Sequence, residues 1–148
     1  MSINQEIISS HLAKWQDILR IRDWEIRIIV AEKDWRKSGD IKIDQDNKIA
    51  ALMINQKLEN QFLEEVIIHE LLHLKLWSMD QLIEELLTGV FGSDEKDPKR
   101  VFAYGQFMGV LESTTQDLTK ALLSATGEER EFLGLRVERQ VRKELEHK

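Results

Sequence analysis

The spacing of hydrophobic residues along this 148-residue chain changes from helical to strand-like and back again. Apolar residues recur every three or four positions across residues 3–19, which predicts an amphipathic helix that packs on a core. The segment "WEIRIIVAE" at 24–32 alternates apolar and polar residues, as a half-buried strand does. "IKI" at 41–43 and "IAALMI" at 49–54 predict two more strands, with the turn-forming clusters "SGD" and "DQDN" before each of them.

The longest uninterrupted helical pattern begins at Asn60. It contains no Gly or Pro through at least Trp77, and it then either continues or breaks and restarts through "MDQLIEELL". The segment "TGVFGSDEKDPKR" at 88–100 contains two glycines, several acids and the only proline, which predicts a mobile loop. We expect a further helix at about 101–124 and a charged helix at 128–148, which would cap the core or pair with another subunit.

These elements predict an α+β fold in one domain spanning 1–148, with its core at about 22–125. An N-terminal helix and a small three-stranded sheet would precede the long helix and the helices after it. The chain is long enough to bury a core of its own.

Composition limits the chemistry that this domain can use. There are no cysteines, which excludes disulfides, thiolate ligands and cysteine protease chemistry, so any metal must be held by nitrogen and oxygen. The net charge of -6 argues against nucleic acid as a partner. Because no apolar segment reaches bilayer length and the N-terminus lacks a secretory signal pattern, we expect a cytoplasmic protein with no membrane association.

The long helix contains "VIIHELLHL", a His-Glu-x-x-His motif. His69 and His73 lie one helical turn apart on the same face, which is the spacing that two imidazoles need to share one ion. Glu70 lies one position further round the helix. It is close enough to act on another group bound to the same ion, but it is not aligned to be a ligand itself. The motif is typical of a zinc-binding pair with a general base.

The rest of this helix is apolar around most of its circumference, with Glu64 and Lys75 marking one narrow exposed side. Two imidazoles and a carboxylate in such surroundings need partners, and a divalent cation satisfies all three. The alternative is an ordinary core helix whose histidines are hydrogen-bonded.

A catalytic zinc usually has three protein ligands and one water. The other two histidines, His11 and His147, lie on helices near the chain ends, so we expect the third ligand to be an acid. Glu84 and Glu85 follow the motif closely but would point along its axis or lie on a solvated face. Glu112 is better placed, because it lies on a separate helix beside apolar residues.

A peptidase also needs a donor for the negative charge that develops on the substrate carbonyl. Tyr104, the only tyrosine, lies two turns before Glu112 and is a candidate, although its apolar neighbours equally predict core packing. Arg100 is a second candidate or simply a loop charge. Thr115 would either hydrogen-bond a ligand or face solvent.

The motif helix followed by Glu112 resembles the gluzincin clan of zinc metallopeptidases. The segments "DWEIRI", "IAALMIN", "HELLHL" and "LESTTQDL" look like those of small single-domain metallopeptidases from phages and mobile elements, which have been compared with minigluzincins. The resemblance covers about 24–123. It departs from the family pattern at Thr115, where gluzincins often have Asp.

The resemblance implies a zincin-like fold and a Zn²⁺ cofactor held by His69, His73 and Glu112. It also implies that Ile49–Asn55 is the edge strand onto which a peptide substrate adds, the alternative being an ordinary core strand. The expected function is hydrolysis of a peptide or protein substrate by water that Glu70 deprotonates.

Two other classes of protein remain open. The first is a metal-stabilised binding or regulatory module without catalysis, which would close its site with four protein ligands. The second is a metal-free helical interaction protein that recruits a partner through its C-terminal helix.

Overall fold

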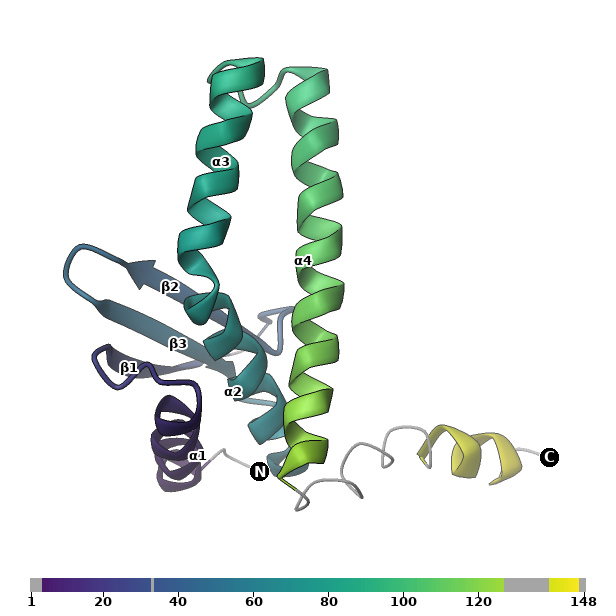
Figure 1. The fold of residues 1–148 in the computed structure, drawn as a ribbon. Coiled ribbons are helices and arrows are strands. Elements are labelled where there is room, and N and C mark those ends of the chain that lie inside the picture. Colours follow the sequence, from purple (N-terminus) through teal and green to yellow (C-terminus); the bar gives the residue numbers. More distant parts are fainter. Residues whose placement is uncertain (1–3, 33, 127–138, 147–148) are drawn as a thin grey trace.

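The computed structural model describes residues 4–32, 34–126 and 139–146, and its fold is α+β, as expected (Figure 1). Residues 139–146 form a short helix. The longer elements, in chain order, are α1 (Gln5–Ile18), β1 (Glu25–Ala31), β2 (Gly39–Asp44), β3 (Ile49–Asn55), α2 (Asn60–Lys75), α3 (Trp77–Phe91) and α4 (Pro98–Ala125).

The strand order in the sheet is β1-β3-β2, with β1 parallel and β2 antiparallel to β3. The alternation expected for β1 is confirmed, because Ile26 and Ile28 pack against the core while Ile29 is 47% exposed. The expectation that β3 is the edge strand is wrong, since β3 lies between the other two, as the alternative of a core strand required. Its continuous apolar sequence fits a central strand, and β2 is the outer strand that contacts α2.

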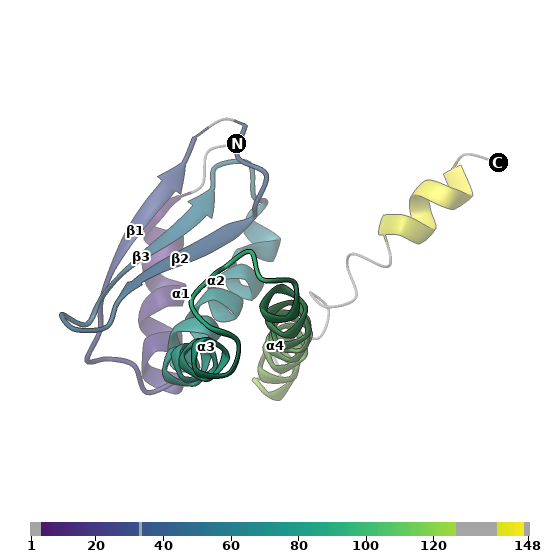
Figure 2. The same cartoon turned by 90° about the horizontal axis from the view of Figure 1, so that it is seen from above.

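The helices α1 and α2 cover one face of the sheet, and the hydrophobic core lies between these helices and the sheet (Figure 2). Ile8, Leu12 and Trp15 of α1 are at most 6% exposed, which confirms that this helix packs on the core.

The same packing overturns the expected exposed side of α2 at Glu64, which is only 3% exposed. The indole Nε1 of Trp15 donates a hydrogen bond to Glu64 Oε1 at 2.7 Å, and Lys14 Nζ donates to the same oxygen at 2.9 Å. Because α1 supplies these donors, the carboxylate is tolerated inside. Lys75 is exposed, as expected.

The long helix breaks at Leu76, between α2 and α3, which decides between the two alternatives left by the sequence. The backbone of Leu76 has φ -94° and ψ 7°, outside the α-helical region, although its N–H still donates to Leu72 O.

The helices α3 and α4 form an antiparallel hairpin that rises away from the sheet (Figure 1). The expected loop at 88–100 is wrong in extent, because α3 continues to Phe91 and α4 begins at Pro98. The carboxylate of Asp97 caps α4 by accepting from the N–H groups of Lys99 and Arg100 at 2.9 and 3.1 Å. Asp followed by Pro is therefore the start of a helix here.

The expected C-terminal helix at 128–148 falls partly outside the described residues, as does His147. Within it, residues 139–146 are helical and exposed. In the parts of the chain that the structure covers, every helix is too short or too polar to cross a membrane.

Candidate metal centre

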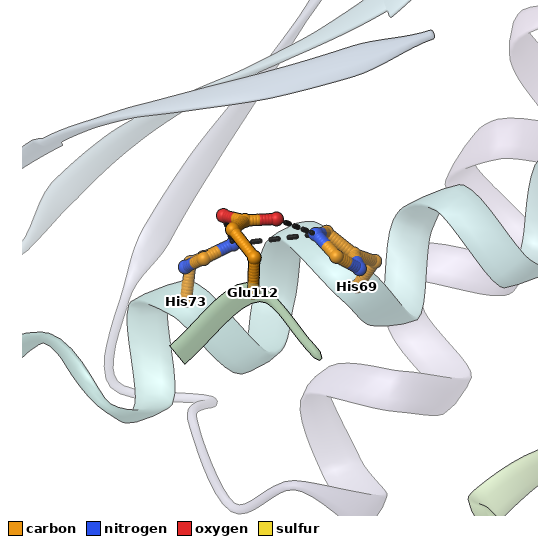
Figure 3. A group of neighbouring side chains, drawn as sticks. All are labelled: His69, His73 and Glu112. Atoms are coloured by element: carbon orange, nitrogen blue, oxygen red, sulfur yellow. Dashed lines mark hydrogen bonds and ion pairs between the residues drawn. The ribbon is translucent and has the colours of Figure 1, made fainter. Parts of the chain in front are cut away.

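Three side chains from two helices converge on one point (Figure 3). His73 Nε2 lies 2.9 Å from Glu112 Oε1, and His69 Nε2 lies 3.2 Å from Glu112 Oε2. The two Nε2 atoms are 3.3 Å apart. The structure therefore brings together the two motif histidines and the acid that the sequence favoured as third ligand.

Two features of the chain produce this convergence. The one-turn spacing on α2 aims both rings in the same direction. The helix α4 packs against α2, and the side chain of Gln116 on it contacts His69 and Glu65 of α2. Glu112, one turn before Gln116 on the same helix, therefore reaches across to the histidines.

The spacing of the three donor atoms fits a small tetrahedral cation. Bonds of about 2.0–2.1 Å at tetrahedral angles separate the ligand atoms by about 3.3 Å, and the distances here are 2.9, 3.2 and 3.3 Å. Two imidazole lone pairs facing each other at 3.3 Å repel unless a cation or a proton lies between them. Two nitrogens and one carboxylate oxygen form a donor set that is common for zinc.

Gln116 orients one of the two rings. Its Oε1 lies 2.9 Å from His69 Nδ1, and its Nε2 donates to Glu65 Oε1 at 2.8 Å. The amide oxygen can only accept, so Nδ1 of His69 carries the proton and Nε2 presents its lone pair to the centre. Sequence reasoning missed Gln116, because a glutamine on a helix carries no signal of its own for such a role.

Glu70 lies beside this centre in a cleft of about 670 Å³. The cleft is bounded by α2, by β2 and the residues just before it, and by α3 and α4. Burial, together with the charges of Asp40 and Glu112, raises the pKa of Glu70 to about 7. A carboxyl group with such a pKa exchanges protons readily near neutral pH.

Gly39 allows β2 to approach α2 closely next to Glu70. A Cβ atom at Gly39 would lie 2.5 Å from Val66 Cγ1 and 3.4 Å from Glu70 Cγ. A Cβ atom there would force Val66 or the strand to shift, so this glycine permits the close approach of the outer strand to the motif helix.

The electrostatic surroundings favour a neutral ring at His73. Burial lowers the pKa of His73, and the negative charge of Glu112 partly offsets this effect. Asp80 of α3 lines the same cleft, and burial raises the pKa of its carboxyl group. A neutral imidazole is the form that binds a metal.

The other candidate residues lie elsewhere. Among the described residues, the group that could hold a metal ion has three members and excludes Glu84 and Glu85. Tyr104 is not one of the cleft-lining residues of the described chain. Arg100 lies in the first turn of α4, where its Nη2 is 3.5 Å from Thr88 Oγ1.

The sequence left two possibilities for Thr115, a hydrogen bond to a ligand or a position facing solvent, and the structure shows neither. The side chain of Thr115 is fully buried, and no hydrogen-bond partner for its Oγ1 lies in the described part of the chain. The hydrogen bond to a ligand comes instead from the neighbouring residue, Gln116.

No protein-family model, curated protein or solved structure matches this chain.

Proposed function

We propose that this chain is a zinc-dependent peptidase with a zincin-like fold. One observation carries the proposal: the donor atoms of His69, His73 and Glu112 converge at zinc-ligand spacing in the cleft that also contains Glu70. The sequence motif supplies two of the ligands and the base, and the packing of α4 on α2 supplies the third ligand.

When bound to these three residues, Zn²⁺ supplies Lewis-acid chemistry that acidifies water and polarises a peptide carbonyl. Glu70 acts as general base, accepting a proton from the attacking water and passing it to the leaving amide nitrogen. Gln116 holds His69 in the tautomer that binds the metal.

The position of β2 supports a peptide as substrate. β2 is an outer strand, paired with β3 on one side, and its residues line the cleft on the side of Glu70. An extended peptide can pair with such a strand through main-chain hydrogen bonds, which places a scissile bond beside the metal centre. This role was expected for β3. Because β3 is the central strand, we assign the role to β2 instead.

The three-member ligand group also favours the peptidase over a metal-stabilised module without catalysis. Structural zinc sites are normally closed by four protein ligands, whereas catalytic sites keep a position for water. In the described part of the chain the group consists of two histidines and one glutamate.

The experiment compares wild-type protein with the Glu70→Gln variant, both loaded with zinc. Cleavage of a complex peptide mixture is followed by mass spectrometry. We expect both proteins to hold one zinc, and we expect Glu70→Gln to lower the rate by about 10²–10⁴, the range for loss of a general base. Glu85→Gln, an exposed acid on α3, is the matched control and should cleave like the wild type.

Two results would contradict the peptidase proposal. One is the absence of new peptide termini with zinc-loaded wild-type protein, in which case the non-catalytic module would replace it. The other is equal cleavage by the wild type and by Glu70→Gln.

A further inference from the structure

The helix α3 is rich in apolar residues, yet it contains no buried residue. Four large side chains on it are more than half exposed: Met79 (64%), Leu82 (53%), Leu86 (54%) and Val90 (73%). They follow one another at intervals of three and four positions, so they form one stripe along the helix.

The stripe points away from the metal centre. Each residue turns the helix by about 100°, so the four stripe residues lie about 80–160° round α3 from Asp80, which lines the cleft. Val110 of α4, 65% exposed, lies about 160° round from Glu112. Seen from above, the sheet lies on one side of the hairpin, and no described element covers the opposite side (Figure 2).

We propose that this surface binds the same surface of a second copy of the chain, so that two hairpins form an antiparallel four-helix bundle. We call it the hairpin face and define it by Met79, Leu82, Leu86, Val90 and Val110. The proposal does not depend on zinc or on catalysis.

The apolar area available matches what a stable dimer needs. Five exposed aliphatic side chains contribute on the order of 100 Å² each, or roughly 500 Å² per copy. Two copies would therefore bury about 1,000 Å² of apolar surface. A standard interface of about 1,600 Å² that is about 65% apolar, as in homodimers, buries the same amount.

The charges of the hairpin favour one pairing within such a bundle. Glu85 is an exposed acid about 60° round α3 from Leu82, and α3 contains no Lys or Arg. Lys99 is exposed on α4, about 20° round the helix from Val110, and residues 98–110 contain no acid. Opposite charges meet when α3 of one copy lies against α4 of the other, whereas pairing α3 with α3 would bring like charges together.

The test is sedimentation equilibrium of the purified full chain at concentrations from about 1 to 200 μM. The monomer mass is 17.4 kDa, so we expect a species of about 35 kDa. The double variant Leu82→Glu/Leu86→Glu should sediment as a monomer, because it would bury four uncompensated carboxylates in a dimer. The same apolar-to-acid change at Ile29, 47% exposed on β1, is the matched control and should leave the dimer intact.

Circular dichroism of each variant shows whether the helices are retained. If the double variant loses helix, Val110→Glu, on the other helix of the hairpin, replaces it as the test. A wild-type protein that is monomeric at 200 μM overturns the proposal, and so does a helical hairpin-face variant that remains dimeric.

Discussion

At the scale of single residues, the sequence identifies the groups that chemistry makes distinctive. His69, Glu70 and His73 stand out because two imidazoles and an acid at helical spacing have few other uses, and Glu112 stands out as an acid among apolar neighbours. Gln116 does not stand out, because its role depends on how α4 is rotated against α2. A surface glutamine and a glutamine that orients a ligand look the same in sequence.

Gln116→Leu should weaken zinc binding by about 10–100-fold, the usual effect of removing a group that orients a metal ligand. The substitution removes the acceptor for His69 Nδ1 and the donor to Glu65. Competition with a chromophoric chelator measures the affinity. Gln106→Leu, the same change at an exposed position of α4, should bind zinc like the wild type, and equal affinities for all three proteins would remove Gln116 from the site.

At the scale of elements, the periodicities predict most of the helices and strands, while their ends and neighbours depend on contacts. Asp97 and Pro98 read as loop residues but begin α4, since the same residue types serve turns and helix starts. The strand order cannot be obtained from periodicity, which reports burial on each side of a strand and not the identity of its neighbour. Glu64 was expected on an exposed side because α1 could not be docked from sequence.

Gly39→Ala should destabilise the fold by about 1–3 kcal/mol, the usual cost of overpacking. The added Cβ would meet Val66 Cγ1 at 2.5 Å and push β2 away from α2. Val66→Ala removes that methyl group, so the double variant should lose less stability than the two single variants combined. Urea unfolding measures the change in unfolding free energy for the two single variants and the double variant. If the two single changes simply add up in the double variant, the contact between Gly39 and Val66 does not cause the loss of stability.

The contact between α1 and α2 should make stability depend on pH through His11. Burial lowers the pKa of His11, against a smaller opposing effect of Glu64, so the folded state favours the neutral ring. The folded state is therefore stabilised relative to the unfolded state above the unfolded pKa of His11, about 6.5, and it loses this stability as the pH falls below that value. His11→Gln should flatten the decline in melting temperature between about pH 7 and 5, and parallel curves for both proteins would contradict this role.

At the scale of the whole molecule, the sheet with α1 and α2 forms a base and the α3–α4 hairpin stands on it (Figure 1). The candidate metal centre lies where the hairpin meets the base, so its geometry depends on how the two are docked. The sequence predicts the α+β class and three ligands on two helices. It does not predict the cleft, because the outer strand that bounds the cleft is identified only by the assembled sheet.

The most direct test of the central claim is the zinc content of purified protein after dialysis against trace zinc, measured by elemental mass spectrometry together with the melting temperature. We predict one zinc per wild-type chain, nearly none in His73→Ala or Glu112→Ala, and a lower melting temperature for the wild type after chelation, because metal binding is linked to folding. Wild-type protein without stoichiometric zinc, or variants that bind as much zinc as the wild type, would contradict the claim that His69, His73 and Glu112 form one metal site.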